Sequence, residues 1–205
     1  VSPTNAAKLK AALTACGVKR PLELRFPRHG FIRHRLLTPE TTGMDRLCAA
    51  KAAWAMAGGP AIIIDLGTAI TIDAISSDGV FLGGTILPGP KLWLQSLNSG
   101  TAQLPLLDKE SEEIIPEASA MGSLGRNTAE AICLGLAHGL FGAVERIVAL
   151  HLAATDKDAQ IYTTGGAAKL LRGNVKFPFI HAPDLVLEGI WLAAQPLLAK
   201  KRRKN

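Results

Sequence analysis

Ile62-Ile63-Ile64-Asp65-Leu66-Gly67-Thr68-Ala69 is an apolar, β-branched run that ends in an acid, a glycine and a hydroxyl. Such a run predicts a buried strand that delivers Asp65 to its carboxyl end, where a sheet opens to solvent. Gly67 lets a ligand approach the backbone closely, and Thr68 offers a hydroxyl and a main-chain N–H. Turns of this kind form concavities in which successive N–H groups point at a phosphate. The segment therefore predicts one half of a nucleotide phosphate clamp.

Two acids in this region differ in what they indicate. Asp65 could simply accept hydrogen bonds from turn amides, but with Gly67 and Thr68 following it we favour contact with a cation or a phosphate. Asp73 lies inside the next predicted strand and could be a ligand or face solvent, so we assign it no role.

A second strand-to-helix junction contains paired glycines, in Thr163-Thr164-Gly165-Gly166-Ala167-Ala168. Gly165 and Gly166 would let a flat or charged ligand lie against the backbone at the N-terminus of a helix. Alone, this is a weak signal. Two such junctions in one chain, each after an apolar strand, together indicate a nucleotide site.

The motif Gly43-Met44-Asp45-Arg46 places an acid beside a base after a threonine-rich loop. At a helix start, Asp45 would be favoured by capping and by the helix dipole, which is the purely structural interpretation. The functional interpretation makes Asp45 a general base that accepts a proton from a substrate hydroxyl. Arg46 could then hold an anionic group of the substrate through its planar fork.

The order of predicted elements is mixed α/β. Gly58-Gly59-Pro60 breaks the chain and predicts a boundary between residues 1–59 and 60–205. Residues 77–79 predict a hairpin turn. Predicted strands cover residues 22–26, 61–66, 68–76, 80–87, 160–164 and 179–181, and predicted helices cover residues 5–16, 44–57, 91–98, 128–154, 167–171 and 185–199, with Pro196 able to shorten or kink the last.

Bulk composition bounds the class of protein. The 205 residues are 48% hydrophobic and 20% charged, which suits a globular protein with a sizeable core. The three cysteines are scattered without CxxC spacing, so we expect a reducing, cytoplasmic setting and no zinc site. Much of the net charge of +6 lies in the tail at 200–204, which lacks interleaved aromatics, so nucleic acid is an unlikely partner. We expect no membrane span.

Taken in order, these motifs resemble those of type III pantothenate kinases, members of the acetate-kinase/sugar-kinase/actin superfamily. The resemblance runs over nearly the whole chain, and its most distinctive stretch is the one around Asp65. It is similar to the family at Val1–Asn5, Thr38–Arg46, Asp65–Asp73, Gly83–Gly89, Thr101–Pro105, Asn127–Ile132, Thr164–Gly166 and Asp184–Gly189.

The resemblance implies ATP-dependent phosphorylation of pantothenate, the first step towards coenzyme A. It implies that Asp45 is the proton acceptor, and that the loop Gly43, Met44, Asp45 and Arg46 contacts pantothenate. Asp65 resembles the ligand of a monovalent cation, K⁺ or NH₄⁺, and Mg²⁺ would accompany ATP. Gly67, Thr68, Gly165 and Gly166 resemble the ATP-binding turns. Thr128 resembles a pantothenate contact supplied by the neighbouring subunit, which implies a homodimer with shared active sites.

The implied fold is two RNase H-like, actin-like ATPase halves, of which the first is only partly present. The family opens with a strand that ends in an Asp-x-Gly-Asn-Thr turn. This sequence has no such turn, so we expect either that it is incomplete at that end or that the protein has lost this half of the clamp. Leu36 stands where the family usually has a tyrosine. Two alternatives remain: a non-catalytic relative acting as a nucleotide-binding or transcription-accessory protein, and another kinase of the superfamily.

Overall fold

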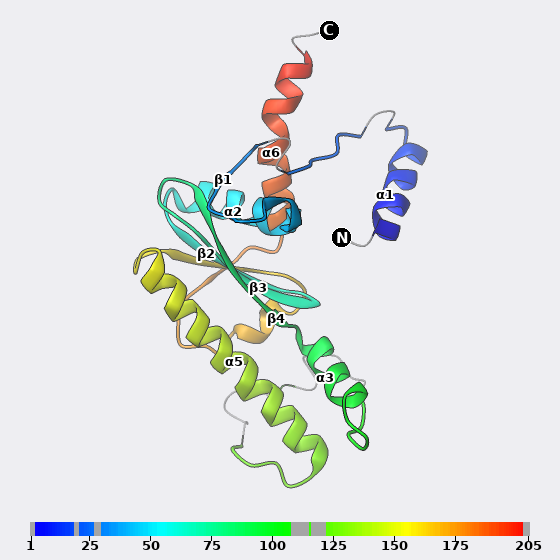
Figure 1. Ribbon diagram of the computed structural model, residues 1–205, viewed down its shortest axis with the longest axis vertical. Helices are drawn as coiled ribbons and strands as arrows, with labels where there is room; N and C mark the ends of the chain where they lie inside the picture. Colours follow the sequence, from blue (N-terminus) through cyan, green and yellow to red (C-terminus); the bar gives the residue numbers. More distant parts are fainter. Residues whose placement is uncertain (1–2, 19–20, 27–29, 108–114, 116–121, 203–205) are drawn as a thin grey trace.

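The computed structural model of the protein describes residues 3–18, 21–26, 30–107, 115 and 122–202 and is built around a six-stranded sheet (Figure 1). The strand order is β1-β4-β3-β2-β5-β6. Strands β2, β3 and β4 form an antiparallel meander, β5 and β6 continue parallel to β2, and β1 pairs parallel to β4. This confirms the mixed α/β class and matches an RNase H-like half. The strands are β1 (Arg33–His34), β2 (Ala61–Leu66), β3 (Ala69–Ile75), β4 (Val80–Pro88), β5 (Gln160–Thr164) and β6 (Ile180–His181).

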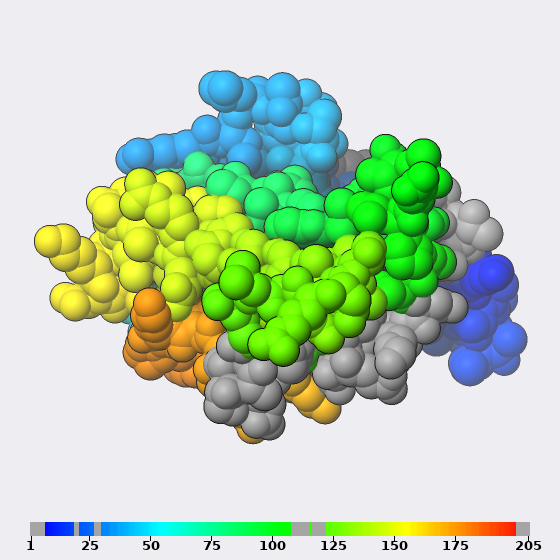
Figure 2. Space-filling view, turned by 90° about the horizontal axis from the view of Figure 1, so that it is seen from below, coloured from blue at the N-terminus to red at the C-terminus, as the bar shows by residue number. Residues whose placement is uncertain are grey.

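Helices cover both faces of the sheet. In Figure 1, α2 and α6 lie on one side of it and α5 on the other, while α1 stands apart from the sheet. Figure 2 views the second side, with α5 lying across it beside α3. The helices are α1 (Pro3–Ala15), α2 (Met44–Ala57), α3 (Pro90–Ser99), α5 (Thr128–Ala154) and α6 (Leu185–Arg202), with 3₁₀ turns η1 (Pro39–Thr41) and η3 (Ala168–Leu171).

The sheet separates two hydrophobic cores. Side chains alternate along β2, so Ile62 and Ile64 join the core under α5 whereas Ala61 and Ile63 join the core under α2. Because β2 is buried on both faces, its sequence is a continuous apolar run and does not alternate between apolar and polar residues. By the same alternation, the pairing of Asp65 with Thr71 places both side chains on the α2 side.

Helix α5 is the longest element, with 27 residues. By length and composition alone it could cross a membrane. Its apolar stripe instead packs against the sheet, which is the arrangement of a core helix. The buried residues of this stripe are Ile132, Leu136, Ala137, Leu140, Phe141, Val144 and Val148.

Helices α2 and α6 pack at backbone distance. Gly189 is buried in α6, and a Cβ built on it would overlap the backbone carbonyl of Cys48 in α2. The two helices can therefore approach this closely only because position 189 has no side chain. The contact seats α6 on α2 and so helps to hold the first turn of α2 over the sheet.

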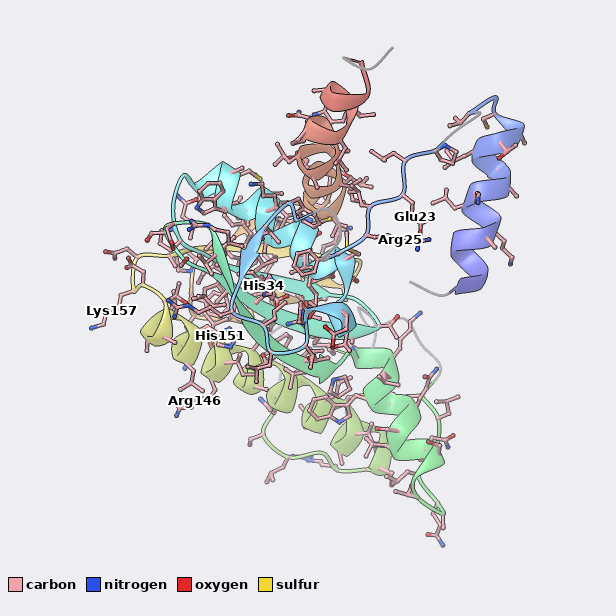
Figure 3. The ribbon with its side chains drawn as sticks, turned by 45° about the horizontal axis from the view of Figure 1, so that its top comes forward. Glu23, Arg25, His34, Arg146, His151 and Lys157 are labelled. Atoms are coloured by element: carbon pink, nitrogen blue, oxygen red, sulfur yellow. The ribbon has the colours of Figure 1, made fainter. Side chains whose placement is uncertain are left out.

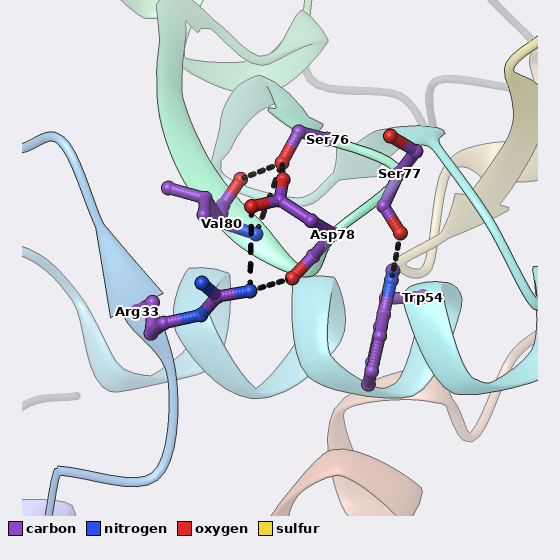
Figure 4. A network of polar contacts seen from close by, with 6 residues as sticks. All are labelled: Arg33, Trp54, Ser76, Ser77, Asp78 and Val80. Atoms are coloured by element: carbon purple, nitrogen blue, oxygen red, sulfur yellow. Dashed lines mark hydrogen bonds and ion pairs between the residues drawn. The ribbon is translucent and has the colours of Figure 1, made fainter.

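The predicted hairpin turn at 77–79 joins β3 to β4 and is tied to its surroundings (Figure 4). Arg33 of β1 binds Asp78 through the backbone oxygen and the carboxylate, and the Trp54 indole of α2 donates to the Ser77 oxygen at 3.0 Å. Gly79 has a φ of +75°, and a Cβ there would lie 2.9 Å from the Trp54 ring. The hairpin, β1 and α2 are thus locked together.

The strand expected at residues 22–26 is wrong. The segment is irregular, Leu22 is exposed, and Glu23 and Arg25 form a local ion pair at 2.9 Å (Figure 3). The alternating pattern suits a strand, but a strand needs a partner edge, and it is Arg33 and His34 that pair with the start of β4, at Val80 and Phe81. Alternation alone could not tell which of two nearby segments pairs.

Most other predicted elements agree to within two residues. The segments 44–57, 61–66, 128–154 and 160–164 have the expected bounds. The helix predicted at 167–171 is the 3₁₀ turn η3, and α6 runs through Pro196 to Arg202. The basic tail lies partly outside the described residues. The boundary after Gly59 stays a prediction, while α2, which precedes it, packs on the sheet formed mainly by later strands.

Candidate active site

The carboxyl ends of β2 and β5 bring the two glycine turns together. Because these strands are parallel and Asp65 pairs with Thr164, the turns that follow them leave the same edge of the sheet. The backbone N–H of Ala167 donates to the Leu66 oxygen at 3.0 Å, which ties the second turn to the first. Gly67, Thr68, Gly165 and Gly166 are therefore neighbours in space, although about a hundred residues separate the pairs in sequence.

A third glycine turn closes on the same place. Gly89 precedes α3, and its N–H donates to the Thr68 oxygen at 2.9 Å. A Cβ at Gly89 would overlap the backbone oxygens of Gly67 and Thr68. Gly89 ends the stretch Gly83–Gly89 that resembles the family, but nothing in the sequence pattern indicated that it would pack against the first turn.

Gly165 is required at its position for two reasons. Its φ of +92° belongs to the left-handed region, which side chains rarely adopt. A Cβ there would also overlap the Asp65 carboxylate and the Leu66 carbonyl. Gly166, by contrast, has open space where a Cβ would be. The first glycine thus makes room for the acid, and the second leaves the surface of the turn accessible.

The substrate motif lies at the start of α2. Gly43 is the N-cap and makes no side-chain capping bond. Asp45 is exposed in the first turn, and its Oδ1 accepts the N–H of Arg46 at 2.9 Å. Asp45 is therefore not the N-cap residue that the structural interpretation suggested, although it does satisfy one first-turn N–H. A Cβ at Gly43 would overlap the Asp45 carboxylate in its present rotamer, so the glycine leaves room for the acid beside it.

Arg46 reaches from α2 to the sheet. Its Nε donates to both carboxylate oxygens of Asp73 at 3.1 Å, and its Nη2 also contacts Asp73. The guanidinium lies 5.8 Å from the Phe81 ring centre, within cation–π range. Burial alone would lower the pKa of Arg46, but the hydrogen bonds and charge of Asp73 outweigh it and raise that pKa.

Asp73 is the site residue that sequence reasoning passed over. Its side chain is only 1% exposed, so it does not face solvent. Gly84 on β4 covers it, since a Cβ there would overlap the Asp73 carboxylate. The signal was present: an acid in the middle of an apolar strand, opposite a glycine, requires a buried cationic partner. What was missing was the identity of that partner, which lies 27 residues away.

Asp65 is a half-buried carboxylate in a negative environment. Burial raises its pKa, and the charges of Asp45 and Asp73 raise it further. Among the described residues, no N–H or O–H group donates a hydrogen bond to its side chain, so the alternative of a carboxylate held by turn amides does not apply. An ionised carboxylate in these surroundings is stabilised by a cation.

The oxygen atoms around Asp65 could hold a cation. Gly165 and Gly67 leave a cradle beside the carboxylate that a Cβ at position 165 would fill, and the Leu66 carbonyl lies in it. The described residues contain no group of three or more His, Cys, Asp and Glu side chains that could hold a metal ion. One carboxylate with backbone oxygens is an oxygen-only donor set, which suits a hard cation better than a metal that prefers nitrogen or sulfur ligands.

Thr128 is not brought beside the other predicted residues. It is the first residue of α5, exposed, and presented by a capping box in which Asn127 accepts the N–H of Glu130 at 2.9 Å. In Figure 1 this end of α5 lies on the side of the sheet opposite α2 and well away from it. Two cavities, one between α5 and residues 173–176 and one beside Phe177 and Phe179, are lined by none of the predicted site residues.

Comparison with known proteins identifies the family to which this arrangement belongs. A sequence profile described as type III pantothenate kinase matches residues 1–150. The chain belongs to the type III pantothenate kinase family. It is 36% identical over 171 residues to the type III pantothenate kinase of Herminiimonas arsenicoxydans, which covers 82% of this chain and 63% of that protein. It is 40% identical over 152 residues to that of Halorhodospira halophila, covering 74% and 56%.

The chain thus spans less than two thirds of the length of these family members. Among solved structures, it is similar to a conserved putative Baf family transcriptional activator from Campylobacter jejuni. The TM-score is 0.58 at 19% identity, over 83% of this chain and 72% of that one. At this identity the likeness shows a shared fold, and it carries nothing about activity.

Proposed function

We propose that this protein catalyses the ATP-dependent phosphorylation of pantothenate to 4′-phosphopantothenate, the first step of coenzyme A biosynthesis, in the cytoplasm. One observation carries the proposal within the family: Arg46, next to Asp45 on the first turn of α2, binds Asp73 on β3, which pairs with Ile63, two residues before Asp65 on β2. The substrate motif and the glycine turns therefore share one end of the sheet.

The proposed reaction transfers the γ-phosphoryl group of ATP to the primary hydroxyl of pantothenate. Asp45 accepts the hydroxyl proton as the oxygen–phosphorus bond forms and the bond to the β-phosphate oxygen breaks, releasing ADP. Its second carboxylate oxygen is available because only Oδ1 accepts the Arg46 N–H. Such a transfer depends on positioning and electrostatics more than on covalent help.

The glycine turns have the role of holding the triphosphate. Gly67, Thr68, Gly165 and Gly166 expose backbone at one edge, where a phosphate chain can approach closely. Mg²⁺ bound to ATP would neutralise charge on the β- and γ-phosphates. Asp65, with the Leu66 carbonyl, would hold K⁺ or NH₄⁺ and so offset the negative charge that faces the nucleotide.

We further propose a homodimer in which Thr128 completes the substrate site of the neighbouring subunit. The first turn of α5 is exposed, and hydrogen bonds of Glu130 with Asn127 and with the Arg126 N–H tie it to the residues before it. Since this end of α5 lies away from α2 within one subunit (Figure 1), contact between Thr128 and a substrate held by Asp45 would have to cross a subunit boundary.

A direct assay tests the proposal. The purified chain is incubated with ATP, Mg²⁺, K⁺ and pantothenate, and both ADP and phosphopantothenate are measured. We expect turnover that Asp45→Asn lowers by a factor of about 10² to 10⁴, the range for loss of a general base. Omitting pantothenate controls for ATP hydrolysis. A folded chain that binds ATP but forms no phosphopantothenate would contradict the kinase activity and favour the non-catalytic alternative.

A further inference from the structure

The buried pair of Arg46 and Asp73 has a geometry that the reaction described above leaves unused. Asp73 lies in the middle of β3 and is 1% exposed, whereas the Arg46 side chain retains 15% exposure. Asp73 is therefore the closed end of the pair, and Arg46 is the partner whose side chain solvent still reaches. An ion pair with no other purpose would gain little from this arrangement, because desolvation cancels much of the attraction.

The hydrogen bonds leave Arg46 with unused donors. A guanidinium has five N–H groups in a rigid fork. Asp73 engages Nε and Nη2, which are on the same edge of the fork. Among the described residues, Asp73 accepts all of the side-chain hydrogen bonds that Arg46 donates. The opposite edge of the fork is thus left for another acceptor.

The surroundings prevent the fork from turning. The Phe81 ring lies 5.8 Å from the guanidinium carbon, and Gly84 packs over the Asp73 carboxylate. Thr71, two residues before Asp73 on β3, pairs with Asp65, so the side chains of Thr71, Asp73 and Asp65 lie on the same face of the sheet. Asp73 therefore holds the inner edge of the Arg46 guanidinium, and it does so on the face of the sheet that also carries Asp65.

We propose that Asp73 is a positioning residue, whose buried carboxylate fixes the guanidinium of Arg46 so that its remaining N–H donors bind the carboxylate of pantothenate. This inference rests on the proposed function, because it names how that site selects an anionic substrate. Asp73 itself touches neither substrate nor nucleotide. Without it, Arg46 keeps its charge but loses its orientation, and the substrate carboxylate loses a preorganised partner.

The test compares pantothenate with pantothenyl alcohol, in which a neutral hydroxymethyl group replaces the carboxylate. We expect Asp73→Asn to raise the KM for pantothenate about tenfold, the scale of one misplaced charge-assisted hydrogen bond. The KM for the alcohol, the KM for ATP and kcat should each stay within about twofold of the wild-type values. A role in folding alone would impair both substrates equally.

Two further variants keep the result interpretable if Asp73→Asn is poorly folded by thermal unfolding. Asp73→Glu retains the charge but moves the carboxylate, and we expect the same selective loss for pantothenate. Arg46→Met should raise the same KM, and adding Asp73→Asn to it should produce no further rise, because the carboxylate acts through the arginine. Asp78→Asn is the matched control: Asp78 also pairs with an arginine, but at the exposed hairpin.

Equal loss for both substrates, or an unchanged KM for pantothenate in a folded Asp73 variant, would overturn this inference while leaving the proposed function standing. Failure of the wild-type chain to phosphorylate either substrate would overturn the proposed function and the inference with it. The two failures are thus told apart by the wild-type rate alone.

Discussion

Replacement of Gly189 by alanine should destabilise the protein, although alanine is the better helix former. Gly189 is buried in α6 where that helix crosses α2, and an added Cβ would overlap the Cys48 carbonyl and lie 2.8 Å from the Cys48 Cα. The contacted atoms are backbone, so no side-chain rotation can relieve the overlap. The two helices must move apart.

The size of the effect follows from two opposing contributions. Overpacking of this kind costs up to about 3 kcal/mol, and the upper end applies because separating the helices loosens every contact between them. The change from glycine to alanine within a helix contributes about 1 kcal/mol in the other direction. The net loss is about 2 kcal/mol, which for a chain of this length lowers the Tm by roughly 4–8 °C.

Thermal unfolding followed by circular dichroism measures the shift, with Gly135→Ala as the matched control. Gly135 is also inside a helix, but a Cβ there would have nothing within 4 Å. Only the propensity contribution remains, so this variant should raise the Tm by about 2–4 °C. The reasoning fails if Gly189→Ala melts at or above the wild-type temperature, or if both variants shift in the same direction.

Other predictions concern the ionisable groups and the second glycine turn. Because burial and neighbouring carboxylates raise the pKa of Asp65 from its ordinary 3.8, the folded state binds this proton more tightly than the unfolded state does. Without K⁺, wild-type stability should therefore fall relative to Asp65→Asn as the pH rises from about 4. K⁺ at about ten times its Kd should raise the free energy of unfolding at pH 7 by about 1.4 kcal/mol in the wild type only. An equal gain in Asp65→Asn would mean that the ion binds elsewhere. Burial, together with the Asp45 charge, raises the pKa of the Cys48 thiol to about 11. At pH 8.5 we therefore expect iodoacetamide to label exposed Cys16 and to spare Cys48 until the chain is unfolded. Peptide mass spectrometry of the labelled chain measures the difference. Gly165→Ala should weaken ATP binding at least tenfold, because the new Cβ overlaps the Asp65 carboxylate and the residue needs a positive φ. Isothermal titration calorimetry measures the affinity. An unchanged affinity would mean that this turn is not part of the nucleotide site.

The local part of the site was predictable because its signals are local. An apolar β-branched run followed by Asp65 and glycines predicts a strand end, and two such junctions predict a common edge when the strands run parallel. The bounds of α5 and β5 followed in the same way from local runs of apolar residues. Each of these inferences uses residues within a few positions of one another.

The rest required contacts between distant segments. Asp73 has no local partner, and its pairing with Arg46 depends on how α2 lies over β3. The predicted strand at residues 22–26 failed for the same reason, because its pattern was suitable while the edge of β4 was taken by Arg33 and His34. Neither outcome is encoded in the residues nearest to the position concerned.

The sequence by itself determined most of the elements and the glycine turns, because backbone preferences and side-chain periodicity act over one or two turns of chain. Only the tertiary structure decided that Gly89 closes on the first turn, that Gly189 lets α6 meet α2, and that Asp73 neutralises Arg46 beneath the sheet surface. These are matters of distance and desolvation between segments far apart in sequence, and they exist only once the chain has folded.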